Sequence, residues 1–232
     1  MLEKHGIQKS VSQAKRKYSL NEDYFDEIDT PNKAYILGFL YADGYNNRIN
    51  NTVVLSLNRE DREILEKISK EVGSTKPLFE SNYTPDDGVE RHMLILAMAS
   101  KHMCESVEKW GLTQNKTFTI TFPNFLEDEL IPHFIRGYFD GDGCACVYCR
   151  KDTRQKSIAT SIMSSVSFCE GLLKYLKNKE IYFCLDIPKN HEQNGIVRSH
   201  SMKENKKFMN LIYKDADLYL TRKLKKFQEF YK

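Results

Sequence analysis

The chain has 232 residues, of which 41% are hydrophobic and 29% charged, a composition typical of a globular protein with one large domain or two small ones. It contains no run near the roughly 18 apolar residues that span a bilayer, and its first residues, MLEKHGIQKS, lack the apolar core of a secretory signal. We therefore expect an intracellular protein with free cysteine thiols, in the cytoplasm of a bacterium or a phage-infected cell, or in an organelle. The formal net charge of +3 neither requires nor excludes a nucleic acid partner.

The first half of the chain is predicted to form helices and strands in the order αββαββα. Thr30 and Pro31 are typical of a helix start, which predicts a helix over residues 31–42. Residues 52–57 alternate with period two, the pattern of a strand with one covered face. The other predicted elements are a short polar strand at 46–50, a helix from Asn58 to Gly73, strands at 76–83 and 89–98, and a helix at 101–110.

The second half repeats this order with weaker signals. Its predicted elements are a helix at 132–139, strands at 144–150 and 156–163, a helix after Ser165, strands at 181–187 and 196–200, and a final helix from about residue 203. The pair Asn194-Gly195 predicts a hairpin turn between the last two strands. The predicted domains are a lead-in at 1–30, a first half at 31–111, a packed linker at 112–130 and a second half at 131–232.

A nine-residue pattern occurs once in each half. Residues 36–44 read ILGFLYADG and residues 135–143 read IRGYFDGDG, which places Asp43 and Asp142 99 residues apart. Each copy carries small residues at positions i and i+4 of its helix, Gly38 with Ala42 and Gly137 with Gly141. Glycine inside a helix costs about 1 kcal/mol relative to alanine, so the small stripe indicates close approach of another helix. The simplest partner for each helix is the other, packed in parallel about a pseudo-twofold axis.

This packing would place Asp43 and Asp142 side by side at the C-terminal ends of the two helices. Two like charges would then share one site, and each would face the negative end of a helix dipole. A divalent cation resolves the conflict, and oxygen ligands alone favour a hard ion such as Mg²⁺, which commonly bridges carboxylates to phosphates. Paired acids, metal and phosphate together indicate hydrolysis of a phosphodiester. The alternative is a metal-free structural repeat protein in which both acids are incidental helix caps.

These two stretches resemble the paired signature of the LAGLIDADG homing endonucleases, matching it at the glycine, the small residue and the final Asp-Gly. The resemblance covers most of the chain. It implies an α+β fold of two pseudo-symmetric αββαββα halves, each with a saddle-shaped antiparallel sheet, joined through the paired motif helices. It also implies a monomer that straddles double-stranded DNA and makes Mg²⁺-dependent, site-specific double-strand breaks, as in intron homing.

The same resemblance assigns roles to individual residues. Asp43 and Asp142 would hold the metal at the scissile phosphates, with the backbone carbonyls of Ala42 and Gly141 as further ligands. Lys116 and Lys223 would stabilise charge in the transition state or activate water. Tyr41 stands where the motif has its first aspartate and Asp140 keeps that aspartate, at a position that is not a metal ligand in the family.

Outward-facing residues of the two sheets are expected to contact DNA, because Arg and Lys suit guanine while Asn and Gln suit adenine. The candidates are Asn46, Arg48, Asn50, Lys76, Tyr83, Arg91, Arg150, Arg154, Gln155, Lys156, Arg198 and His200. We expect a polar, basic sheet surface whose DNA binding weakens steeply with salt. A rival function is a non-cleaving protein on the same scaffold, either an intron RNA maturase or a DNA-binding regulator. The presence of both aspartates favours the endonuclease.

Overall fold

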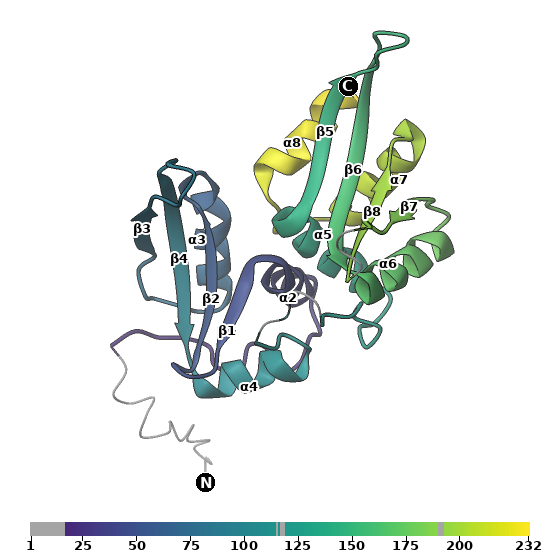
Figure 1. Cartoon of the computed structure of the whole chain (residues 1–232). Helices are drawn as coiled ribbons and strands as arrows, with labels where there is room; N and C mark the ends of the chain where they lie inside the picture. The colour runs from purple at the N-terminus through teal and green to yellow at the C-terminus, as the bar shows by residue number, and fades with distance from the viewer. Residues whose placement is uncertain (1–16, 115, 117–118, 190–192) are drawn as a thin grey trace.

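The computed structural model describes residues 17–114, 116, 119–189 and 193–232. The chain forms two similar halves, each an antiparallel sheet backed by helices, on either side of a central pair of helices (Figure 1). The elements of the first half are α2 (Pro31–Asp43), β1 (Gly44–Asn47), β2 (Thr52–Asn58), η1 (Arg59–Asp61), α3 (Arg62–Glu71), β3 (Phe79–Tyr83), β4 (Arg91–Ala99) and α4 (Lys101–Lys109). The elements of the second half are α5 (Ile131–Asp142), β5 (Gly143–Cys149), β6 (Lys156–Ser165), α6 (Val166–Asn178), β7 (Cys184–Asp186), β8 (Asn194–Ser199), α7 (Met202–Tyr213) and α8 (Thr221–Phe230).

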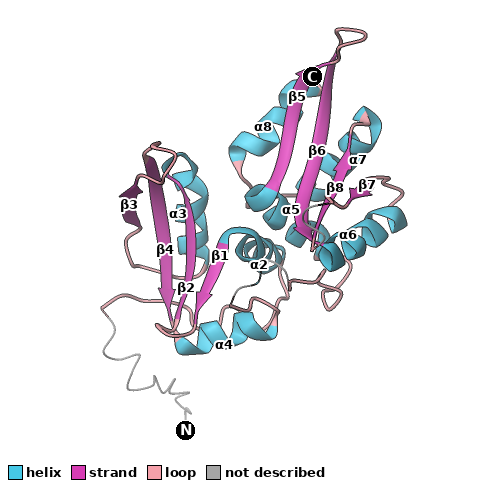
Figure 2. Ribbon diagram, viewed as in Figure 1, coloured by secondary structure: helices cyan, strands magenta, loops and turns pink. Residues whose placement is uncertain are grey.

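The two sheets have the same topology. Each has four strands, in the orders β1-β2-β4-β3 and β5-β6-β8-β7, and all neighbouring strands are antiparallel (Figure 2). The side chains of β2 and β4 alternate between the buried face of their sheet and its outer face. The predicted α+β fold, with two pseudo-symmetric halves and antiparallel sheets, is therefore confirmed. No helix in the described part of the chain is both long and apolar enough to cross a bilayer.

Local sequence signals set several helix ends. The hydroxyl of Thr30 accepts a hydrogen bond from the Lys33 amide at the start of α2, and Ser100 and Ser165 cap α4 and α6 in the same way. Gly111 follows α4 with a φ of 94°, a left-handed conformation that suits glycine. These signals explain why most of the predicted helix boundaries lie within a few residues of the observed ones.

The motif helices α2 and α5 pack directly on each other. A methyl group at Gly38 would overlap the carbonyl of Phe134, and one at Gly137 would overlap the carbonyl of Tyr35. The two backbones therefore touch at the glycines, which no larger residue would permit. The predicted joining of the halves through these helices is confirmed, and the contact fixes where both helices end.

The segment between the halves contributes to the core. Leu112, Ile120, Phe122, Leu126 and Leu130 are all buried. Phe122 packs against Phe168 of α6, with ring centroids 5.7 Å apart. We propose that this segment, at 112–130, is a packed linker between a first half at 31–111 and a second half at 131–232.

Three expectations about the second half were wrong. Asn194 and Gly195 do not form the hairpin turn but begin β8, paired with Ser165 and Ser164. A Cβ atom at Gly195 would lie 3.1 Å from the Cys169 sulfur, so this glycine permits close packing of α6 rather than a turn. The strand expected at 181–187 is shorter, since β7 covers only Cys184–Asp186. An additional helix, α8, follows α7.

Candidate functional site

The two motif aspartates are the last residues of α2 and α5, and they lie side by side. A Cβ atom built at Gly141 would lie 2.8 Å from the Oδ2 atom of Asp43, so this carboxylate reaches the last turn of the opposite helix. Both aspartates are exposed to solvent, and the helices α2 and α5 that end in them lie between the two sheets (Figure 1). The small residues of the motif thus bring two carboxylates from distant parts of the chain to one place.

The surroundings of this carboxylate pair disfavour negative charge. Burial of much of the Asp43 side chain, followed by the nearby charge of Asp142, raises the pKa of Asp43 to about 6. Burial likewise raises the pKa of Asp142 above its ordinary value. Although both groups reach water, protein surrounds most of each one. The charges of Lys116 and Lys223 oppose these shifts in part, and a divalent cation would lower both pKa values further.

Each half places a lysine at the C-terminal end of its own motif helix. The Lys116 ammonium donates to the Leu40 carbonyl at 3.0 Å and also to the Gly44 carbonyl. The Lys223 ammonium donates to three carbonyl oxygens of α5 and β5, those of Phe139 at 2.6 Å, Gly141 at 3.0 Å and Gly143 at 2.6 Å. Positive charge at these two ends opposes the helix dipoles, which offsets part of the cost of placing acids there.

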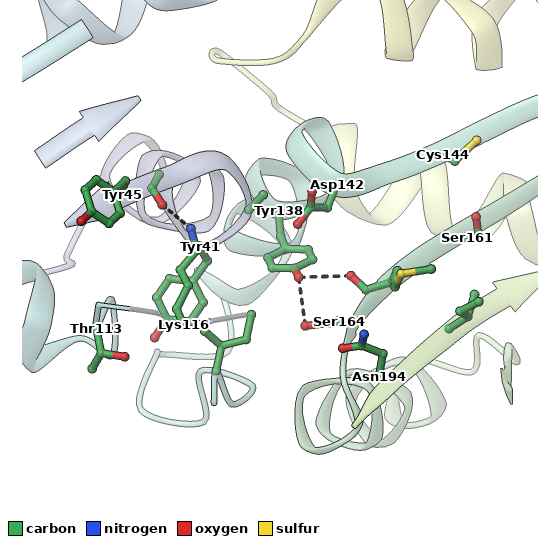
Figure 3. A pocket seen from close by; sticks show the side chains of 15 residues that line it. Tyr41, Tyr45, Thr113, Lys116, Tyr138, Asp142, Cys144, Ser161, Ser164 and Asn194 are labelled. Atoms are coloured by element: carbon green, nitrogen blue, oxygen red, sulfur yellow. Dashed lines mark hydrogen bonds between the residues drawn. The ribbon is translucent and has the colours of Figure 1, made fainter. Parts of the chain in front are cut away.

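The two lysines differ in exposure. Lys223 is buried, with 4% of its surface accessible, while Lys116 is partly exposed. Lys116 and Asp142 line the same pocket of about 680 Å³, which contains side chains from both halves (Figure 3). Burial lowers the pKa of each lysine to about 8, and the two motif aspartates oppose this shift. The site is therefore pseudo-symmetric in layout but open on the Lys116 side.

Asp140 has a structural role in this fold. Its carboxylate is buried and accepts hydrogen bonds from the Tyr35 hydroxyl at 2.9 Å, the Tyr213 hydroxyl at 2.7 Å and the Leu220 amide at 2.7 Å. Burial raises the pKa of Asp140 to about 6. These bonds fix the segment between α7 and α8 to α5, and α8 begins there and carries Lys223. In the first half, Tyr41 occupies the matching position and its hydroxyl donates to the Trp110 carbonyl.

One ion pair beside the site was not expected from the sequence. The Arg222 guanidinium contacts both carboxylate oxygens of Asp61, with Nε–Oδ1 and Nη2–Oδ2 distances of 2.9 and 3.1 Å. Arg222 lies at the start of α8 and Asp61 in η1, so the pair joins the two halves. No local pattern connects these positions, which are 161 residues apart.

The predicted DNA contacts fall into three groups. Four of them lie on the outer faces of the sheets or at the ends of these faces: Tyr83, Arg91, Arg198 and His200. Six lie in turns or loops: Arg48, Asn50, Lys76, Arg150, Arg154 and Gln155. The other two, Asn46 and Lys156, lie on the side of their sheet that helices cover. Asn46 is buried, and its amide donates to the Cys104 and Leu112 carbonyls. Lys156 lines a pocket against α8. Asn46 and Lys156 are therefore withdrawn as candidates.

Three of the arginines expected on the basic sheet surface have acidic partners, and the surface itself stays a prediction. Arg91 and Arg198 point to the outer faces, and each contacts an aspartate. Arg91 contacts Asp87 with an Nη2–Oδ2 distance of 2.7 Å, and Arg198 contacts Asp186. Arg48 turns toward α4 and contacts Glu105 and Glu108. Asp87 lies only four residues before Arg91, whereas Asp186, Glu105 and Glu108 come from other elements and could not be assigned from the sequence pattern.

The donor set at the helix ends fits a hard divalent cation. Two carboxylates converge there, and the last carbonyls of each helix lack partners within the helix. The Gly141 carbonyl accepts one hydrogen bond from Lys223, which leaves its second lone pair for a ligand.

A second group with possible metal ligands, Asp23, Asp26 and His102, lies exposed near α4. In this group the Nε2 atom of His102 lies 2.7 Å from the Oδ1 atom of Asp26, and this direct contact explains why the side chains lie together without an ion.

Comparison with solved structures gives this arrangement a context. No family model matches the sequence, and no curated protein matches it. Similar folds include the LAGLIDADG homing endonuclease I-LtrWI bound to target DNA, with a TM-score of 0.56, 16% identity, and coverage of 91% of this chain and 89% of that one. The LAGLIDADG homing endonuclease I-GzeII in complex with its DNA target has a TM-score of 0.60, 13% identity, and coverage of 87% and 88%. The chain has the LAGLIDADG homing endonuclease fold.

The homing endonuclease I-WcaI, bound to its DNA recognition sequence, supports the same conclusion, with a TM-score of 0.59, 14% identity, and coverage of 88% and 91%. The likeness extends over both halves, so the LAGLIDADG fold accounts for the whole arrangement of sheets and motif helices. At these identities the likeness concerns the fold. The fold alone does not determine the chemistry, which depends on the side chains of this chain.

Proposed function

We propose that this chain is a site-specific DNA endonuclease that hydrolyses one phosphodiester in each strand of a duplex and requires a divalent cation, with Mg²⁺ as the physiological ion. The observation that carries the proposal is the convergence of Asp43 and Asp142 at the ends of two helices packed through glycine. Binding of DNA by three proteins of the same fold supports duplex DNA as the substrate.

In this proposal Asp43, Asp142 and the carbonyls of Ala42 and Gly141 hold the cation. When bound, the ion supplies an activated water and neutralises charge on the leaving oxygen. A solved structure of I-SmaMI, with a TM-score of 0.51 and 13% identity, holds uncleaved DNA in the presence of calcium ions, which supports the use of divalent cations in this fold. The pKa of Asp43, raised to about 6, implies that proton release accompanies cation binding near pH 6 and fades above it.

The two lysines have distinct roles in this proposal. Lys116 borders the open pocket, where its ammonium can stabilise charge on a phosphate or orient water. The Lys223 ammonium is held by three carbonyl oxygens, so it positions the end of α5 and contributes a fixed positive field. The site is thus expected to treat the two DNA strands unequally.

The test is cleavage of sites selected from a random duplex library in the presence of Mg²⁺, by the wild type and by Asp43→Asn and Asp142→Asn. Asparagine keeps the shape of aspartate but removes its charge, so double-strand breakage should fall on the order of a hundredfold or more. Affinity for the same duplex should stay near the wild-type value, because repulsion with DNA phosphates is also removed. Glu66→Gln, at an exposed position on α3, is the control for the loss of one negative charge, and this variant should cleave the duplex at the wild-type rate.

Cleavage by both asparagine variants at the wild-type rate would refute the assignment of the acids. Binding without any cleavage by the wild type would instead favour the rival function, a non-cleaving DNA-binding regulator. Binding of an intron RNA in preference to duplex DNA would favour the maturase.

A further inference from the structure

The outer faces of the two sheets lead directly away from the acidic pair. β1 begins at Gly44 and β5 at Gly143, each immediately after a motif aspartate. Helices cover the opposite face of each sheet, where Val53, Leu55 and Ile162 are buried. DNA held at the acids would therefore lie along the outer faces, and their side chains would be the ones that read base edges.

The strand register identifies the side chains on these faces. Val54 lies opposite both Tyr45 and Ala97, and Ile95 lies opposite Phe79, so their side chains share the outer face of the first sheet. In the second sheet, Ala159 lies opposite Cys146, and Met163 lies opposite Ile196. The centre of the first outer face is therefore largely apolar, whereas in the second Ser161, opposite Cys144 and Arg198, separates Ala159 from Met163.

Several of these apolar side chains are left open to solvent. Phe79 is 62% exposed, Met163 52% and Tyr45 44%. Exposed apolar side chains gathered on one face are typical of a binding surface, since isolated ones are common but contiguous ones are rare on monomers. A partner of this surface must therefore offer apolar groups as well as the phosphates that the acids require.

Cations able to read guanine are scarce on the strands of these faces, although Lys17 and Lys76 line a pocket with Ala97. Among the described strand residues that point outward, the cations are Arg91 and Arg198, and both are held by aspartates. Each guanidinium already donates to an aspartate, and this ion pair competes with the bidentate contact by which arginine reads guanine. Arg150 and Arg154 lie at the tip of the β5–β6 hairpin, beyond the strands, where contacts to phosphates are expected.

In the major groove, the apolar group that base pairs present is the C5 methyl of thymine, and small or apolar side chains such as alanine and phenylalanine recognise it. We infer that the DNA substrate is rich in A·T pairs where the sheets cover it, with thymine methyls packed on the apolar centre of the first outer face and on Met163 and Ile196 of the second. The inference rests on the proposed function, because it assumes that duplex DNA occupies these faces. The residues that set this preference include Val54, Phe79, Ile95, Ala97 and Met163.

The experiment is selection of bound duplexes from a random library by the intact protein with Ca²⁺, so that recovery depends on binding alone. The recovered sites should be dominated by A·T pairs on both flanks of the centre. Replacing each selected thymine with uracil, which lacks only the methyl, should weaken binding by about fourfold for each methyl that is buried, given about 0.8 kcal/mol per buried carbon group. Unchanged affinity after all such replacements would overturn the inference.

A variant pair tests the location. Ala97→Arg adds an unpaired cation to the outer face and should shift one selected position toward guanine. Ser167→Arg adds the same charge on the exposed side of α6 and should change no selected base. Enrichment of G·C-rich sites by the wild type would refute the A·T preference and leave the proposed function standing. Enrichment of no duplex at all would refute both.

Discussion

At the scale of single residues, two lysines make the acidic helix ends tolerable. Lys116 and Lys223 donate to carbonyls at matching positions of the two motif repeats, Leu40 with Phe139 and Gly44 with Gly143. An ammonium group at a helix C-terminus is stabilised by the dipole, whereas a carboxylate there is not. Each repeat thus carries its own local compensation, and a bound cation would complete it between the repeats.

The two lysines should differ in their effect on folding. Lys223→Met keeps the length of the side chain but removes the ammonium donor from three carbonyls, of which that of Phe139 keeps the Gly143 amide as a donor. We therefore expect a loss on the order of 3 kcal/mol in the free energy of unfolding. Lys116→Met should cost about 1 kcal/mol or less, because water can reach the carbonyls it leaves. Urea denaturation of both variants without metal measures the difference. Equal losses would contradict a structural role specific to Lys223.

The sequence predicted those residues that its internal repeat marks. Asp43 and Asp142 stand out because two copies of one pattern agree, and the glycines explain how the copies meet. The pair of Asp61 with Arg222 could not be predicted, because it depends on how α8 lies across the two halves. The prediction that Asn46 contacts DNA failed for a related reason. A polar residue in a short strand is expected at the surface unless its hydrogen-bond partners in the backbone are known.

At the scale of elements, the motif helices are the central contact of the molecule. The carbonyls of Tyr35 and Phe134 occupy the space that a methyl group would need at Gly137 and Gly38. Sequence periodicity predicted the helices, and the small-residue stripe predicted their partner. The hairpin assigned to Asn194-Gly195 shows the limit of such reasoning, because a glycine can be required by packing as well as by a turn.

Gly137→Ala should therefore destabilise the protein even though alanine favours helices by about 1 kcal/mol. Overlap with the Tyr35 carbonyl forces the helices apart, and we expect a net loss of about 2 kcal/mol in the free energy of unfolding. Thermal unfolding of this variant beside Ser167→Ala, on the exposed face of α6, measures the effect. A gain in stability would mean that the two backbones do not touch at this position.

At the scale of the whole molecule, α8 breaks the symmetry of the two halves. The α-helices of the first half, within its described residues, end with α4, whereas the second half continues past α7 into α8. From α8, Lys223 reaches the end of α5, Arg222 reaches Asp61, and the Thr221 hydroxyl donates to Glu63 at 3.1 Å. The helix thus ties the second half to the first beside the acidic pair. These contacts of α8 account for the burial of Lys223, whereas Lys116 in the other half is left partly exposed.

The position of Ca²⁺, located by anomalous diffraction in crystals of the protein bound to a selected duplex, would show directly whether the motif aspartates hold a cation. We expect an ion between the ends of α2 and α5, with oxygens of Asp43 and Asp142 and of DNA phosphate at about 2.3–2.6 Å. The same crystals of Asp43→Asn should show weaker density at that place. An ion bound only at Asp23, Asp26 and His102, or none near the motif aspartates, would show that the acidic pair is not a cation site.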